Sequence, residues 1–381
     1  MNSISKYQKR LKANLRNIPG WRTKKRIIVF ESDDWGSIRM HSAEDKRELE
    51  KLGFDFTNQE FNTYDALESN DDLSQLFEVL SLYKDEYGNH PVITAASIVG
   101  NPDFKRIKES GFQKYYWESM SETCKRYPNH DKVCDLYKYG IEKHLFYPIF
   151  HGREHLNVQR WLRLLREGNK SILYAFEHEV TGISKDVNGK SLLSMQAAFD
   201  LDNIEDIQFM REVIKEGTVE FERLWGYRAR YFVPTNGPFN NALEFDLKHS
   251  GIDYILGERV QKEPQGYGKY KKHYHWIGKK NNLNQIYLTR NGFFEPSVIS
   301  LGFDYEPIER CLKNIEDAFY WHKPAIISSH RLNYIGSIEK TNQEKNIELF
   351  DKLLKKILQK WPDVMFVNSV QLGDLINNDK E

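Results

Sequence analysis

Short runs of apolar residues alternate with stretches of helical periodicity along most of the chain. Residues 26–30 (RIIVF) form a compact β-branched and aromatic run, which is typical of a buried strand. Similar runs predict further strands over 91–99, 145–150, 229–233, 252–256, 325–328 and 364–367. Between these runs, apolar positions recur every three or four residues, which is typical of helices with one buried face. This spacing predicts helices over 42–53, 71–87, 157–166, 203–225, 240–250, 307–321 and 342–360, and a short one after Ser369.

Repeated strand–helix units with continuous apolar strands indicate a parallel sheet covered by helices. About seven such units predict an α/β fold, a distorted or incomplete (β/α) barrel that forms one domain over residues 26–381. Loop insertions are expected at roughly 100–145, 168–200 and 258–300, the last with hairpin character. No GxGxxG motif follows the first strand and no GxxxxGK[ST] motif occurs anywhere, so a nucleotide-binding fold is not supported.

The composition is that of a globular chain with a large core. The 381 residues are 40% hydrophobic and include 22 Phe, 21 Tyr and 8 Trp, which excludes a disordered chain. Because 55 basic residues balance 55 acidic ones, the net charge gives no reason to expect nucleic acid as a partner. No apolar run approaches the ~18 residues that a membrane span needs. Cys124, Cys134 and Cys311 are few and widely spaced, so neither a disulfide framework nor a CxxC zinc site is expected.

Residues 1–25 form a basic N-terminal arm. The first 30 residues contain no acidic side chain, and no apolar stretch of the kind found in secretory signals follows the basic positions, so a cytoplasmic location is expected. Tyr7, Leu11 and Leu15 share one face at helical spacing, which predicts a short basic amphipathic helix over 5–17. Two alternatives stay open for this helix. It could pack on the domain as a solvated arm, or it could make peripheral contact with an anionic membrane surface or polymer.

Acidic residues and histidines stand where three of the predicted strands end. Asp33 and Asp34 follow the first strand, and two adjacent carboxylates there are costly unless something such as a divalent cation pairs with them. The alternative is an Asx-type turn with both carboxylates in water. His151 and His155 follow the third strand with a spacing of four, and neutral imidazoles suit Zn²⁺. His330 closes a later strand, where an ordinary edge histidine is the alternative.

The ends of parallel strands form one rim of an α/β barrel, which is where catalytic residues gather. All five side chains are therefore expected to meet at that rim. Asp34, His151 and His155 would form a two-His, one-carboxylate metal site with open positions for water and substrate. His330 would be a titratable group on the opposite wall.

Taken together, these motifs resemble those of the NodB-type polysaccharide deacetylases, carbohydrate esterase family 4. Residues 32–36 (SDDWG) are similar to the family's T/S-F-D-D-G, with one residue between the second Asp and the Gly. Residues 151–155 (HGREH) are similar to H-S/T-x-x-H, and residues 327–330 (ISSH) to L-x-x-H. Residues 232–237 (FVPTNG) echo R-x-P-x-G only in part. The matched order spans most of the chain.

The resemblance implies a metal-dependent hydrolase that removes an N- or O-acetyl group from a carbohydrate. It implies Asp33 as general base and His330 as general acid, with Asp34, His151 and His155 as metal ligands. Zn²⁺ is the first choice of cofactor, and Co²⁺, Ni²⁺, Mn²⁺ and Fe²⁺ stay open. Contacts to an acetylated carbohydrate are expected from Trp35, Pro234, Asn236, Gly237 and Arg331.

Three departures from the family pattern suggest a divergent subfamily. Gly152 replaces the hydroxyl residue of the second motif. The arginine that orients the base carboxylate is missing before Pro234, and Arg228, Arg230 and Arg331 are the candidates to replace it. The D-x-x-x-W motif of the family has no convincing counterpart.

Three other functions stay open. A glycan-binding relative could keep the metal and have lost turnover. A non-haem Fe(II) oxygenase uses a similar two-His, one-carboxylate site, normally on a β-sandwich. A metal-free glycosidase could use Asp33 with Glu31 or Glu154. For the deacetylase, a role in surface polysaccharide or glycolipid biosynthesis is expected. The sequence leaves open the sugar, the acyl group and the oligomeric state. It also leaves open whether the substrate is polymeric, lipid-linked or nucleotide-linked.

Overall fold

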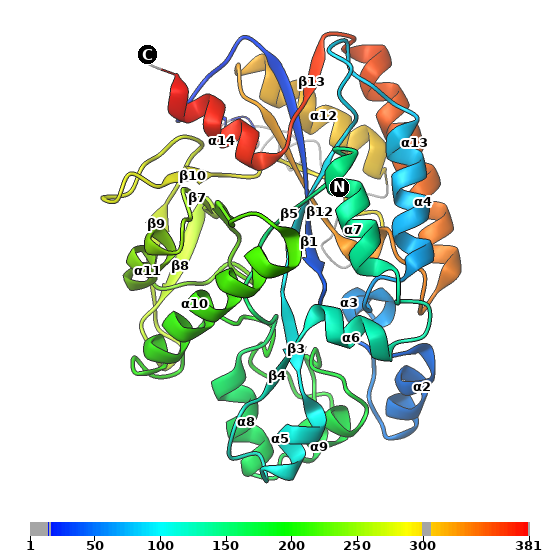
Figure 1. The fold of residues 1–381 in the computed structure, drawn as a ribbon, viewed down its shortest axis with the longest axis vertical. Helices are drawn as coiled ribbons and strands as arrows, with labels where there is room; N and C mark the ends of the chain where they lie inside the picture. The colour runs from blue at the N-terminus through cyan, green and yellow to red at the C-terminus, as the bar shows by residue number, and fades with distance from the viewer. Residues whose placement is uncertain (1–13, 15–16, 299–305, 380–381) are drawn as a thin grey trace, which may run out of the picture.

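A curled sheet of parallel strands forms the centre of the molecule (Figure 1). The computed structural model describes residues 14, 17–298 and 306–379. The strand order is β10-β7-β6-β5-β2-β1-β12-β11, with β13 paired to the start of β1, and every pairing in this sheet is parallel. The strands are β1 (Arg26–Trp35), β2 (Ile93–Ser97), β5 (Phe146–Phe150), β6 (Tyr231–Phe232), β7 (Tyr254–Leu256), β10 (Ile286–Leu288), β11 (Gly292–Phe293), β12 (Ala325–His330) and β13 (Val364–Phe366).

The sheet is an incomplete barrel, which confirms the predicted fold class. In the described part of the chain no pairing joins β10 to β11, so the barrel stays open between these two edge strands. The seven predicted strands are all present, and two further short ones, β10 and β11, lie inside the expected insertion at 258–300. Their apolar runs of two or three residues are too short to give a periodic signal.

Helices lie around the curled sheet, some along its sides and others at its two ends (Figure 1). They are α2 (Ala43–Lys51), α3 (Glu60–Tyr64), α4 (Asn70–Ser81), α5 (Phe104–Glu109), α6 (Met120–Arg126), α7 (Val133–Glu142), α8 (Val158–Arg166), α9 (Lys170–Glu177), α10 (Asp206–Trp225), α11 (Glu244–His249), α12 (Pro307–Tyr320), α13 (Lys340–Lys360) and α14 (Ser369–Asn378), with 3-10 turns η1 (Asn241–Leu243) and η2 (Arg331–Asn333). The insertions add two antiparallel hairpins, β3 (Gly100–Pro102) with β4 (Trp117–Ser119) and β8 (Val260–Pro264) with β9 (Tyr270–Tyr274).

Strand β1 is buried on both faces, which explains its unbroken apolar sequence. Ile28 and Phe30 pack in the layer between sheet and helices, while Ile27 and Val29 face the inside of the curl. Side chains of α14, among them Val370 and Ile376, belong to the same inner cluster as Ile27 and Val29 and fill that end of the curl. The carboxyl ends of the strands therefore form the open end, where the predicted site residues lie.

A buried ion-pair network fixes the turn that follows β1. Arg331 is 0% exposed, and its guanidinium lies 2.9 Å from Asp65 Oδ1 and donates over 2.9 Å to Glu68 Oε2 and to the carbonyl of Ser37. Glu68 in turn accepts hydrogen bonds from the backbone N–H of Gly36, at 3.1 Å to each carboxylate oxygen. The expectation that Arg331 contacts substrate or replaces the motif arginine is therefore wrong, because its side chain points away from the rim into this network.

The N-terminal segment packs against the domain from residue 17 onward. Lys323 is buried, and its ammonium donates to the carbonyls of Pro19, Gly20 and Trp21. Trp21 also donates its backbone N–H to the carbonyl of Ile277 over 2.9 Å. The amphipathic helix expected over 5–17 lies almost entirely outside the described residues. Among the helices of the described ranges, none has the length and apolar character required to cross a bilayer.

The network around Arg331 leads to a stability prediction. Arg331→Met should lower the free energy of unfolding by about 3–5 kcal/mol, because it leaves the buried carboxylate of Glu68 without its cation and Asp65 with only Arg39 at 3.6 Å. Urea denaturation followed by circular dichroism measures the change. The control is Arg228→Met, since Arg228 is exposed and only loosely paired with Glu222 at 3.8 Å; it should stay within about 1 kcal/mol of wild type. Equal losses in the two variants would contradict the role assigned to Arg331.

Candidate metal centre and its pocket

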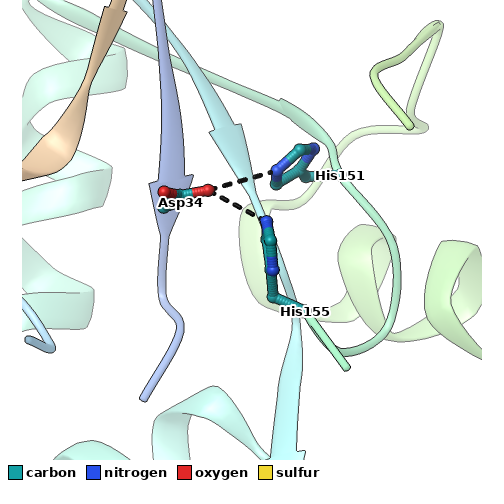
Figure 2. Close-up of side chains that lie close together, drawn as sticks. All are labelled: Asp34, His151 and His155. Atoms are coloured by element: carbon teal, nitrogen blue, oxygen red, sulfur yellow. Dashed lines mark ion pairs between the residues drawn. The ribbon is translucent and has the colours of Figure 1, made fainter. Parts of the chain in front are cut away.

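Asp34, His151 and His155 come together at the carboxyl end of the sheet (Figure 2). All three are buried, and their ligand atoms lie within 4.8 Å of one another. Asp34 Oδ1 is 3.6 Å from His151 Nε2 and 3.0 Å from His155 Nε2. Three residues from two distant segments thus point their ligand atoms at one small volume.

A bulge at the end of β1 turns Asp34 toward the histidines. The pairing of β1 with β2 shifts register between Ser32 and Trp35, and Asp34 has a φ of 79°. Bulges of this kind re-aim side chains and are common beside active sites, and Asp is one of the few residues that tolerates a left-handed φ. The two adjacent carboxylates, Asp33 and Asp34, therefore both line the cavity at this edge instead of pointing to opposite faces.

The loop after β5 brings the two histidines together without a helix. His151 to His155 is not helical, and α8 begins only at Val158. Gly152 has a φ of 117°, and a Cβ built there would lie 3.2 Å from the ring of Phe199. This backbone strongly favours glycine. The departure from the family's hydroxyl residue at Gly152 therefore follows from the conformation of this loop.

Hydrogen bonds fix the tautomer of both histidines. His151 Nδ1 lies 2.7 Å from the carbonyl of Val233, and His155 Nδ1 lies 3.0 Å from the amide oxygen of Gln196. Since both partners are acceptors, each Nδ1 carries the proton and each Nε2 presents a lone pair. Both Nε2 atoms are buried and accept no hydrogen bond. Such partners on the far nitrogen are characteristic of metal-ligating histidines.

The electrostatics of the three side chains fit a divalent cation. Burial raises the pKa of Asp34, and the charge of a protonated His155 or His151 outweighs burial and lowers this pKa well below its usual value. Burial also lowers the pKa of His155 and outweighs the opposite effect of Asp34. The carboxylate of Asp34 and the neutral imidazole of His155 therefore face each other with acceptor atoms. A cation between them removes that repulsion, and two nitrogens with one oxygen suit Zn²⁺ and its neighbours in the first transition row.

Asp33 is clamped by an arginine that the motif analysis did not find. Arg290 donates to Asp33 Oδ2 over 2.6 Å and to Oδ1 over 2.5 Å, and its Nε donates to Glu31 over 2.6 Å. Burial raises the pKa of Asp33, but Arg290 outweighs burial and lowers it. Arg290 follows the short strand β10, so it stands at the same rim although 257 residues separate it from Asp33. None of the candidates Arg228, Arg230 and Arg331 makes this contact.

His330 has its own carboxylate partner. Its Nδ1 is 2.7 Å from Glu295 Oε1, and its Nε2 is 4.0 Å from Asp33 Oδ2. Burial would lower the pKa of His330, but the carboxylates of Glu295, Asp34 and Asp33 raise it to about 9. Glu295 is held in turn by Asn333, whose amide donates to Oε2 over 2.8 Å. Glu295 was not anticipated from the sequence, because a single glutamate in a loop carries no pattern.

A cavity of about 500 Å³ joins these groups. Its walls include Asp33, Asp34, His151, Arg290 and His330, and the turn that carries Pro234, Asn236 and Gly237. Trp35, expected to contact substrate, does not line it. The bulge directs Trp35 into the layer between sheet and helices, where it is 1% exposed and its ring lies 5.0 Å from that of Phe146. Phe293 is an aromatic residue that does line the cavity.

Comparison with known proteins gives a likeness of fold. No family model matches the chain, and no curated protein matches its sequence. The structure is similar to a probable polysaccharide deacetylase from Pseudomonas aeruginosa (10% identity, 94% of this chain and 93% of that one, TM-score 0.45). It is also similar to the Puue allantoinase (12%, 93% and 93%, 0.42) and to a CE4 family pseudoenzyme from Bacillus anthracis (12%, 92% and 66%, 0.38).

One of these three solved structures, the Bacillus anthracis pseudoenzyme, is described as a member of carbohydrate esterase family 4. This chain spans 66% of the length of that protein. A likeness at 10–12% identity concerns the fold, and the chemistry of this chain rests on its own residues.

Two alternatives raised by the sequence lose their support. The parallel, helix-covered sheet differs from the β-sandwich on which oxygenases with a similar ligand set normally occur. The glycosidase pairs named from the sequence, Asp33 with Glu31 or with Glu154, do not form in the cavity. Glu31 is fully buried and bonded to Arg290, and Glu154 is bonded to Arg153 over 2.6 Å and does not line the cavity.

The metal centre can be tested by equilibrium binding of Zn²⁺ to the metal-stripped protein. Wild type should bind one ion tightly, and Gln196→Leu, which removes the partner of His155 Nδ1, should weaken binding about 10–100-fold. His155→Ala removes a ligand and should weaken binding by more than about 100-fold. The control is His249→Ala, on the exposed end of α11. Unchanged affinity in His155→Ala would show that these histidines hold no metal.

Proposed function

We propose that this protein is a metal-dependent hydrolase that removes an acetyl group from the nitrogen or oxygen of a sugar. Asp34, His151 and His155 hold the divalent cation in this proposal, and Zn²⁺ is the first choice. The observation that carries it is the pairing across one cavity of an arginine-bound carboxylate, Asp33, with a glutamate-bound histidine, His330. A base and an acid beside a metal site are what acyl hydrolysis requires.

Asp33 acts as the general base. When bound, the cation supplies Lewis acidity that polarises the acyl carbonyl and acidifies the attacking water. Asp33 takes the proton from that water, and Arg290 keeps Asp33 ionised and fixes the orientation of its carboxylate through two hydrogen bonds. Because Arg290 also binds the buried Glu31, its guanidinium is held in one place before substrate arrives.

His330 acts as the general acid. Glu295 accepts from Nδ1, so the remaining proton of the imidazolium sits on Nε2, on the side of Asp33. That proton goes to the nitrogen or oxygen of the leaving group when its bond to the acyl carbon breaks. The raised pKa of His330 keeps the acid charged at neutral pH, while the lowered pKa of Asp33 keeps the base ionised. The different surroundings of Asp33 and His330 thus make one the base and the other the acid.

The cavity suits one sugar unit with its acyl group. Its volume of about 500 Å³ falls within the range of small-molecule sites. Pro234, Asn236 and Gly237 are proposed to contact the sugar, and Phe293 to pack against it. A role in surface polysaccharide or glycolipid biosynthesis is part of the same proposal.

A protein that binds glycans without turnover is the second candidate. The sequence favoured it because the motif arginine is absent before Pro234. Arg290 makes the contact with the base carboxylate that a motif arginine would make, so this ground for the second candidate is gone. Release of acetate from a sugar distinguishes the hydrolase from the glycan-binding protein.

Asp33→Asn tests the base. This variant should keep one tightly bound metal ion and release acetate from N-acetylated sugars about 10²–10⁴-fold more slowly, since an amide cannot take the proton. Metal content and acetate release are measured on the same sample. The control is Asp186→Asn, in a surface loop that does not line the cavity. Full activity in Asp33→Asn would remove Asp33 as the base, and absence of acetate release from any sugar in wild type would favour the binding protein.

The pair of His330 and Glu295 predicts a pH dependence. An acid must be protonated to act, so kcat/KM should be high below the pKa of His330, about 9, and fall as the pH rises through it. Glu295→Gln removes the carboxylate that raises this pKa while burial still lowers it, so the alkaline limb should move about 1–3 pH units down. Glu295→Asp should restore part of the shift. An alkaline limb that stays in place in Glu295→Gln would show that His330 does not supply the proton.

A further inference from the structure

Glu258 is an acidic residue of the cavity that the proposed reaction does not use. It follows β7 by two residues, so it stands at the same rim as Asp33 and His151. Its carboxylate lies against the turn that carries Gly237, where a Cβ would come within 2.5 Å of Glu258 Oε1. Gly237 has a φ of 94°, so the turn both requires glycine and leaves the space that the carboxylate occupies.

The carboxylate of Glu258 has no hydrogen-bond or ion-pair partner among the residues that the structure describes, and it lines the cavity. Burial of its carboxyl end raises its pKa, although Arg290 and Lys262 oppose this effect. The residue as a whole keeps an exposed side, so a ligand can reach it. Glu258 is thus an acceptor without a donor, beside the proposed reaction centre.

The arginine and lysine side chains that line the cavity are engaged elsewhere, and His330 is bonded to Glu295. Arg290 is bonded to Asp33, Glu31 and Ser328. Lys323 gives its ammonium to three backbone carbonyls, and Arg259 also has a partner. Any ligand beside Glu258 therefore meets a partly desolvated carboxylate. It is stabilised if it donates a hydrogen bond or carries positive charge, and it is repelled if it carries a phosphate.

From this arrangement we infer that Glu258 is a specificity-determining residue, which selects sugars with a hydroxyl or ammonium donor next to the acylated unit and disfavours phosphorylated ones. The inference rests on the proposed function. It narrows the substrate to neutral or partly de-N-acetylated glycans and argues against sugars linked directly to a phosphate at this position.

The test compares matched sugars in the Zn²⁺-loaded protein. One set is the disaccharide of N-acetylglucosamine and its form with one free amine. The other set is N-acetylglucosamine, its 1-phosphate and its 6-phosphate. Selectivity is the preference for the amine-bearing sugar over the phosphates. It is the ratio of kcat/KM values for acetate release where turnover occurs. Where no turnover occurs, it is the ratio of Kd values from NMR titration. Glu258→Gln should lower this selectivity at least about tenfold, which is the loss of one charge-assisted hydrogen bond.

Glu212→Gln on the exposed surface of α10 is the matched control and should leave the selectivity unchanged. A selectivity in Glu258→Gln within about threefold of wild type overturns the inference, since about threefold is less than a charge-assisted hydrogen bond contributes. The two proposals fail separately. If no sugar releases acetate, the proposed function is wrong, while the Kd values still decide whether Glu258 selects among these sugars.

Discussion

The burial of ionised carboxylates at the end of β1 is the constraint on which the rest of the site depends. Glu31, Asp33 and Asp34 fall within four residues of one central strand, and all three are buried. Water cannot stabilise these charges, so the protein must. Arg290 serves Glu31 and Asp33 together, while Asp34 faces two histidine lone pairs and has Arg39 only at 3.4 Å. Asp34 is therefore the carboxylate that a cation could neutralise, and the candidate metal site follows from how the other two are neutralised.

Much of the fold was predictable from sequence because its strands are buried on both faces. Continuous apolar runs such as 26–30 mark such strands, and histidines or aspartates directly after them fall at one rim by the geometry of parallel sheets. Asp33, Asp34, His151, His155 and His330 all follow such runs, and they do lie close together. Their positions are predictable without any side-chain contact, because the strand ends alone place them at one rim.

Other residues could not be placed in this way. Trp35 and Arg331 sit next to rim residues in the sequence, yet each points away from the cavity. Neighbouring side chains alternate in direction, which explains Arg331 beside His330, whereas at Trp35 a bulge breaks this alternation. The bulge after Ser32 keeps Asp34 at the cavity and sends Trp35 into the helix layer. Arg290 and Glu295 could not be predicted, because β10 and β11 are too short to give a periodic pattern of apolar residues. The sequence therefore does not show that these two residues lie at the rim.

The pKa of Asp33 is lowered and the pKa of His330 is raised by partners that lie outside the motifs of these two residues. Arg290 and Glu295 lie within six residues of each other, on either side of β11, in the segment where the barrel stays open. Against the effect of burial, Arg290 lowers the pKa of Asp33 and Glu295 raises the pKa of His330, and 4.0 Å separate Asp33 Oδ2 from His330 Nε2. A single short segment therefore shifts the pKa of both Asp33 and His330. This segment contains the edge strand β11, at which the barrel stays open.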